Sequence, residues 1–120
     1  MNWLDTNSIQ ELTRYLDITG LREKLVAGNI ANIDTPGYQT LDINFHQALE
    51  RAALTQGETP LPPRIVQVQG LIQRPDGNNV SLDRESIVLA GVQLEYRTAI
   101  ALLRQEFNRI NMAINGNNGA

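Results

Sequence analysis

An apolar stripe near the C-terminal end constrains the fold more than any other feature of this sequence. Its members recur three or four residues apart, which is the repeat of one face of an α-helix. They are Leu89, Val92, Tyr96, Ala99, Leu103, Phe107, Ile110 and Ile114. Two successive steps of four meet at Leu103, which predicts less supercoil than a strict heptad repeat would give. A helix with such a face must pack against another part of the chain or against another molecule.

The residues on either side set the expected limits of this helix at 81–115. Ser81 is a suitable N-cap, and the acidic Asp83 and Glu85 suit the first turn, where the helix dipole favours negative charge. Beyond Ile114, the run Gly116-Asn117-Asn118-Gly119-Ala120 should stop the helix. We therefore expect residues 116–120 to form a short tail.

The N-terminal segment, residues 1–35, is also expected to be helical. It has two apolar stripes that are offset by about 140° around the helix. The first consists of Ile9, Leu12 and Leu16, and the second of Ile18, Leu21 and Leu25. The change of stripe falls beside Gly20, so we expect a bend or a restart of the helix there. Pro36 ends the helical segment, and Pro36-Gly37 suits the central positions of a type II turn.

The middle of the chain, residues 36–80, reads as irregular with two short regular pieces. Asn44 followed by Gln47 resembles a capping box, which predicts a short helix that contains Phe45 and Ala52. The alternating run over residues 65–71 predicts a short strand, and Pro75-Asp76-Gly77-Asn78 predicts a turn.

These elements predict one mainly α domain over residues 1–120, in which the long end helices pack as an antiparallel coiled-coil pair. A short helix and an irregular segment with a short strand lie between them. The apolar faces that such a pair leaves uncovered have two possible covers. Neighbouring subunits could cover them, or the middle segment could close a small helical bundle, and the residues alone favour neither.

Composition excludes most catalytic and ligand-binding functions. The chain has no cysteine and one histidine, His46, so a His or Cys metal cluster is excluded and a histidine relay has no partner. The net charge of −3 offers no basic patch for nucleic acid. We found no secretory signal pattern and no apolar run that approaches a membrane span. We therefore expect a protein that is not an enzyme and that needs no cofactor.

The segment from Ala27 to Tyr38 has an unusual polar pattern. Asn29 and Asn32 lie three residues apart near the end of the expected helix, although asparagine is a poor helix former. Their amides could bond the last helix carbonyls or a neighbouring chain, and the small Gly28 and Ala31 would let another helix approach closely. A simple helix end followed by a Pro-Gly turn is the alternative.

Two motifs resemble those of the flagellar rod and hook protein family. The first is Asn29-Ile30-Ala31-Asn32 followed by Thr35-Pro36-Gly37-Tyr38, and it is similar to the N-terminal motif that these proteins share. The second is Asp76-Gly77-Asn78-Asn79-Val80-Ser81-Leu82-Asp83-Arg84-Glu85, just before the last helix. The short length, without a large inserted β domain, points to a proximal rod subunit within this family.

The resemblance implies a structural subunit of the flagellar basal body, exported by the type III route without a cleaved signal peptide and assembled in the periplasmic rod. Its partners would be other rod subunits and basal-body or export-gate proteins, with self-association in a helical assembly and no direct membrane span. Two alternatives stay open, a neighbouring proximal rod protein of the same family and a soluble helical adaptor that binds a partner helix.

The residues expected to mediate assembly form two groups. The motif group consists of Asn29, Ile30, Ala31, Asn32, Thr35, Pro36, Gly37, Tyr38, Asp76, Gly77, Asn78 and Asn79. The helix-packing group adds Leu21 and Leu25 to the eight residues of the C-terminal stripe.

Overall fold

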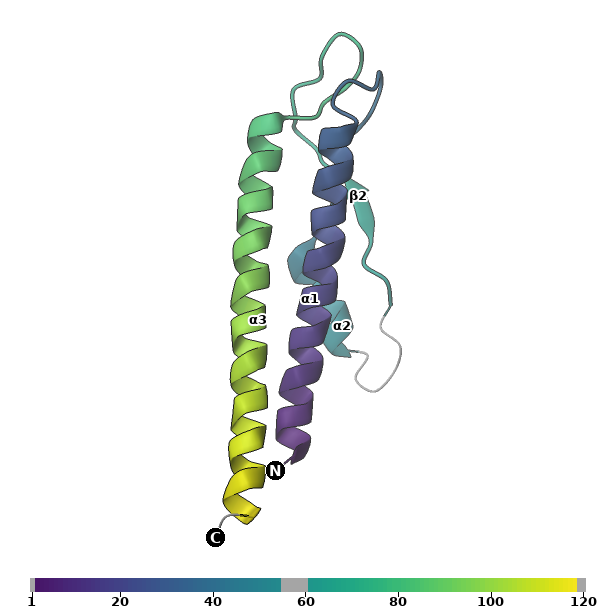
Figure 1. The fold of residues 1–120 in the computed structure, drawn as a ribbon. Helices are drawn as coiled ribbons and strands as arrows, with labels where there is room; N and C mark the ends of the chain where they lie inside the picture. The colour runs from purple at the N-terminus through teal and green to yellow at the C-terminus, as the bar shows by residue number, and fades with distance from the viewer. Residues whose placement is uncertain (1, 55–60, 119–120) are drawn as a thin grey trace.

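The computed structural model describes residues 2–54 and 61–118 of the chain, which form an elongated molecule of 71 × 26 × 18 Å. The described elements are α1 (Asn2–Ala31), β1 (Leu41–Ile43), α2 (Phe45–Leu54), β2 (Ile65–Gln67) and α3 (Leu82–Asn118). The two long helices lie side by side and run in opposite directions, so both ends of the chain lie at the same end of the molecule (Figure 1). The predicted mainly α fold, with its two long end helices in contact, is confirmed.

The helix α1 is continuous across Gly20, so the expected restart at this glycine is wrong. Glycine costs only about 1 kcal/mol inside a helix, which the packing of neighbouring residues offsets. The two offset stripes have a different cause, because α1 contacts α3 as well as α2 and β1. One continuous helix therefore needs apolar residues in more than one direction.

The middle segment packs on α1 and forms the main apolar cluster. Its buried members are Ile18 of α1, Ile43 of β1 and the two alanines Ala48 and Ala52 of α2, and Leu21, Leu25, Phe45 and Leu49 pack against them. Tyr15 meets the ring of Phe45 edge to face, with centroids 5.2 Å apart. The middle segment therefore covers part of α1, as the small-bundle alternative required.

The buried positions on α3 are seven residues apart. Glu85, Val92 and Ala99 are almost fully buried, and Thr19 and Val26, also seven apart, are buried on α1. Because the contact keeps this spacing, the half-exposed Tyr96 and Phe107 lie beside the seam rather than in it. These buried positions all precede Leu103, so the break in the heptad repeat at Leu103 stays a prediction.

The ends of the shorter elements follow from local chemistry. Ser81 Oγ accepts the backbone N–H of Arg84 at 3.2 Å, which confirms the N-cap of α3. Asn44 Oδ1 likewise accepts the N–H of Gln47 at 3.0 Å at the start of α2. The helix α3 runs through Gly116 to Asn118, so the predicted stop at Gly116 is wrong.

The two strands form an antiparallel pair in which Asp42 lies opposite Val66. The strand β2 falls within the predicted run, whereas β1 was not expected from the sequence. Asn29 explains β1, because its side chain accepts the N–H of Leu41 and donates to the carbonyl of the same residue. The helix α1 therefore holds one edge of β1, and β2 occupies the other.

By length and apolar composition alone, the Leu82–Gly116 part of α3 could cross a membrane. The sequence did not lead us to expect this. Glu95 and Arg97 lie near the middle of the helix, where a bilayer would make their charges costly. We interpret the apolar character as packing surface on more than one side of α3.

Candidate assembly site

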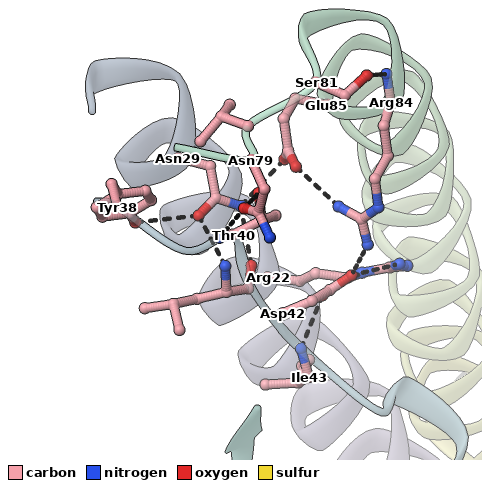
Figure 2. A network of polar contacts seen from close by, with 12 residues as sticks. Arg22, Asn29, Tyr38, Thr40, Asp42, Ile43, Asn79, Ser81, Arg84 and Glu85 are labelled. Atoms are coloured by element: carbon pink, nitrogen blue, oxygen red, sulfur yellow. Dashed lines mark hydrogen bonds and ion pairs between the residues drawn. The ribbon is translucent and has the colours of Figure 1, made fainter. Parts of the chain in front are cut away.

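The two sequence motifs meet at one end of the molecule, where α1 stops and α3 begins. Figure 2 shows polar side chains from α1, β1 and α3 converging there, and we call this cluster the polar junction. It consists of Arg22, Asn29, Tyr38, Thr40, Asp42, Asn79, Arg84 and Glu85. The motifs are about fifty residues apart in the sequence, so the fold itself brings them together.

Asn29 is the central member of the polar junction and is fully buried. Its Nδ2 donates to the carbonyl of Leu41 at 2.8 Å and to Glu85 Oε2 at 3.2 Å. Its Oδ1 accepts the N–H of Leu41 at 3.0 Å and the hydroxyl of Tyr38 at 3.1 Å. One amide thus joins both long helices, β1 and the turn after α1, which explains an asparagine inside a helix.

Asp42 is the anionic centre of the junction. Arg22 approaches it with two nitrogens at 3.0 and 3.2 Å, and Arg84 Nη2 lies 2.7 Å from Oδ2. The backbone N–H of Ile43 also donates to Oδ1 at 2.7 Å. Burial alone would raise the pKa of Asp42, but the hydrogen bonds from Arg22, Arg84 and Ile43 outweigh it and hold the pKa below its ordinary value.

Glu85 is a second buried carboxylate, with a side chain that is 0% exposed. Arg84 Nη1 donates to its Oε1 at 2.8 Å while Asn29 occupies Oε2. Two arginines therefore face two carboxylates, so the junction is neutral and its charges are paired. Burial, followed by the nearby charge of Glu85, raises the pKa of Tyr38, which keeps this hydroxyl a donor.

The two turns of the motifs interlock. The N–H of Tyr38 bonds the carbonyl of Thr35 at 3.2 Å, and Gly37 has a φ of 76°, as a type II turn requires. The N–H of Gly37 then bonds the carbonyl of Asp76 at 2.9 Å. Gly77 has a φ of 87°, and a Cβ placed there would lie 3.3 Å from Gly37 Cα. Gly37 is needed for its positive φ, since a Cβ there would meet nothing within 4 Å, whereas Gly77 is needed both for its φ and because its turn approaches the backbone of Gly37.

The remaining motif asparagines close the ends of α1 and β1. Asn32 Nδ2 bonds the carbonyl of Gly28 at 2.8 Å, and Thr35 Oγ1 bonds Asn32 Oδ1 at 3.0 Å. Asn78 Nδ2 donates to the carbonyls of Asn32 and Thr35, both at 2.9 Å. A further network joins Asn79 Oδ1 to the N–H and hydroxyl of Thr40, at 2.7 and 2.8 Å.

Asn29, Asn78 and Asn79 are therefore internal to the fold, where their side chains bond groups of the chain itself. Ile30 and Asn32 are half-buried, while five motif residues are exposed. The exposed residues are Ala31, Thr35, Pro36, Gly37 and Asp76. A partner that binds directly to this end of the molecule would contact these exposed residues.

The predicted helix-packing residues are divided among several positions. Val92 and Ala99 are buried at the seam, and Leu89, Leu103 and Ile110 are half-buried. Tyr96, Phe107 and Ile114 are 45%, 50% and 51% exposed. Leu21 and Leu25 pack with α2 and β1. The sequence did not identify Arg22, Thr40, Asp42 or Arg84 as site residues, because nothing near them in sequence marks their distant partners.

A second face of α3 is apolar and exposed. Ile87 is 75% exposed, Leu94 is 67% exposed and Met112 is 73% exposed. Leu94 and the buried Ala99 are five residues apart, which places them about 140° apart around the helix. We call the side with Ile87, Leu94 and Met112 the outer face of α3. No other element among residues 2–54 and 61–118 covers it.

The described residues include no group of three or more acidic, histidine or cysteine side chains that could hold a metal. His46 lies on the surface of α2, with an 85% exposed side chain 2.9 Å from Glu50. The site therefore has the character of a structural contact: a rigid polar junction at one end of two long helices and an uncovered apolar face along one of them.

Comparison with known proteins gives consistent relatives, although no family model matches the sequence. The chain is 34% identical to flagellar basal body rod protein FlgB of Escherichia coli, over 73% of this chain and 78% of that protein. It is 31% identical to FlgB of Aeromonas hydrophila, over 84% and 87%. It is 30% identical to FlgB of Aquifex aeolicus, over 86% and 89%.

Proposed function

The chain belongs to the FlgB family of flagellar basal body rod proteins, and from that premise we propose that it joins the rod through the faces of its two long helices. It is a structural subunit of the proximal rod and not an enzyme. The relatives named above are all FlgB, which favours this assignment over the neighbouring proximal rod protein FlgC. Family membership also replaces the soluble adaptor as the leading interpretation.

One observation supports assembly through the helices: α3 is 37 residues long and exposes large apolar side chains on the side away from α1. Burial of such side chains stabilises association by about 25 cal/mol for each Å² of apolar surface removed from water. An exposed set of this size marks an interaction surface rather than a scatter of single residues. Other rod subunits are the proposed partners.

The polar junction has a supporting role in this proposal. It fixes the turn after α1 and the start of α3 with directional hydrogen bonds, so both helices are presented in one orientation. A subunit with a loose junction would present its apolar faces at variable angles. Assembly should therefore depend on Asn29 and Asp42 even where no partner contacts them.

Complementation of a strain that lacks this protein tests the proposal. Phe107→Asp places a charge on a half-exposed apolar position beside the seam, and Leu94→Asp does so on the outer face, at a position that is 67% exposed. Both should abolish motility and rod assembly while the protein is still secreted. Ser86→Asp, at an exposed polar position of the same helix, is the matched control and should swim normally. Normal swimming of both apolar variants would refute assembly through α3.

Export without a cleaved signal peptide and a periplasmic location in the rod form the second part of the proposal. The motifs that this chain shares with flagellar rod and hook proteins support it. Mass spectrometry of the protein in purified basal bodies should give the same N-terminus as in the cytoplasm. A shortened N-terminus in basal bodies would contradict this part and leave the assembly role intact.

A further inference from the structure

We propose that a groove between α1, α2 and α3 receives the outer face of α3 from a second copy of this chain. The inference rests on the proposed rod function and goes further by naming the contact between copies. The groove has a volume of about 710 Å³. Leu12 and Tyr15 of α1, Leu49 and Ala53 of α2, and Leu102 and Glu106 of α3 are among the residues that line it.

The groove has the shape that a helix requires. The helix α2 packs on α1, and α1 packs on α3, so α1 forms the floor and the other two helices form the walls. The lining is mostly apolar. A helix that lay in the groove would cover Leu102, which is 45% exposed, and Ala53, which is also exposed.

The carboxylates at the groove indicate that the incoming helix should carry a positively charged side chain. Arg109 Nη1 lies 3.9 Å from Glu106 Oε1, but Glu106 Oε2 is buried and has no hydrogen-bond partner among the described residues. The same holds for Glu95 Oε2, near Tyr15. Glu11 adds a third carboxylate to this region, whereas Arg14 is already engaged with the carbonyl of Ala52 at 2.8 Å. A buried carboxylate oxygen without a donor is costly, so an arriving guanidinium would be stabilised.

The outer face of α3 carries both apolar side chains and positively charged ones. Ile87 and Leu94 lie seven residues apart, and the exposed Arg97 and Arg104 lie seven apart beside them. Apolar side chains and arginines therefore follow the same helical repeat. A partner copy can thus place apolar side chains against the groove walls and a guanidinium near Glu106, as charge complementarity requires.

The groove and the outer face cannot meet within one molecule, since they lie on different sides of the same α3. Leu94 and Ala99, which lines the groove, are about 140° apart around the helix. The contact is therefore heterologous: each copy gives its outer face to one neighbour and its groove to another. Such contacts repeat along an open helical assembly, as a rod subunit needs.

Site-directed cross-linking tests this contact, and the absence of cysteine from the chain makes introduced thiols unambiguous. One copy carries Leu94→Cys and the other Ala53→Cys, both at exposed positions. Basal bodies from cells that express both variants should contain a disulfide-linked dimer. The pair of Leu94→Cys with Gln69→Cys, an exposed loop residue outside the groove, is the control and should give no such band.

Charge reversal tests the pairing. Arg97→Glu with Arg104→Glu changes only exposed side chains, so the fold should be unaffected, and the dimer yield should fall by about tenfold. These two substitutions belong in the Leu94→Cys copy, and adding Glu106→Arg to the Ala53→Cys copy, whose groove receives that face, should restore part of the yield. Rods that assemble without the Leu94–Ala53 link, or a link to a different protein, would overturn the inference but not the proposed function. Absence of the protein from basal bodies would instead refute the proposed function.

Discussion

Replacement of Asn29 by alanine should destabilise the isolated subunit strongly. The change removes four hydrogen bonds, two to the backbone of Leu41 and one each to Glu85 and Tyr38. Neutral bonds contribute about 1 kcal/mol each and a bond to a charged group somewhat more, so the loss is about 3–5 kcal/mol. That is a large part of the roughly 5–15 kcal/mol that stabilises a domain.

Urea unfolding followed by far-ultraviolet circular dichroism measures this loss directly. The midpoint should fall markedly for Asn29→Ala, and the melting temperature should drop by about 10–20 °C. The matched control is Asn108→Ala, at an exposed position of α3, which should change stability by less than about 0.5 kcal/mol. Equal midpoints for the two variants would refute the view that the junction amide holds the helices together.

Asn29→Asp separates loss of the donor from loss of volume, because the new side chain is almost the same size. At neutral pH it places a negative charge beside the buried carboxylate of Glu85 and loses the Nδ2 donor. It should therefore be at least as unstable as the alanine variant at neutral pH and recover as the pH falls. An aspartate variant as stable as the native chain would show that Nδ2 does not matter.

Three other predictions follow from single residues. The lowered pKa of Asp42 means that its carboxylate stabilises the fold above the unfolded pKa of 3.8, and that this stabilisation is lost as the pH falls through the folded pKa. The urea midpoint of Asp42→Asn should therefore depend less on pH below about pH 4 than that of the native chain. Gly77→Ala should lower the stability measured in thermal melts by about 1–3 kcal/mol, because φ at this position is 87°. Gly91→Ala, at a helical position where an added Cβ meets nothing within 4 Å, should raise stability by up to about 1 kcal/mol, and similar effects of the two changes would contradict the turn argument. Val92→Ala, at a side chain that is 0% exposed, should cost about 1–3 kcal/mol of stability. Ile87→Ala, at a side chain that is 75% exposed, should leave stability unchanged and reduce incorporation into the rod. A larger loss of stability for Ile87→Ala than for Val92→Ala would show that the two faces of α3 are wrongly assigned.

Local chemistry allowed much of this fold to be predicted from the sequence. The cap at Ser81 and the Pro36-Gly37 turn depend on residues a few positions apart, and both are as expected. Helical periodicity likewise located both long helices. Periodicity did not predict which side of α3 packs against α1, because apolar residues occur on several sides of α3. Which of them are buried depends on how α1 packs against it. Tyr96 and Phe107 show this, since each follows the repeat yet is about half exposed.

The polar junction could not be predicted, because its chemistry depends on distant residues. Arg22 and Asp42 are twenty residues apart, and Asp42 and Arg84 are forty-two apart, with no local pattern that links them. Glu85 was expected only to place negative charge in the first turn of α3, where the helix dipole favours it, whereas the structure buries its carboxylate against Asn29. A buried charge of this kind is visible only once the fold has placed its partners.

The junction and the outer face of α3 should respond differently to mutation, and this difference gives the strongest test of how the subunit works. The junction fixes one end of the helix pair with directional bonds among Asn29, Asp42 and Glu85. Farther along the pair, the buried seam relies on the small Thr19 and Ala99, which offer less contact area. Junction variants should therefore lose stability and assembly together, whereas outer-face variants should lose assembly alone. Because the groove lies toward the far end of the pair, a neighbour that fills it should also stabilise the part of the helix pair that the subunit itself holds least firmly.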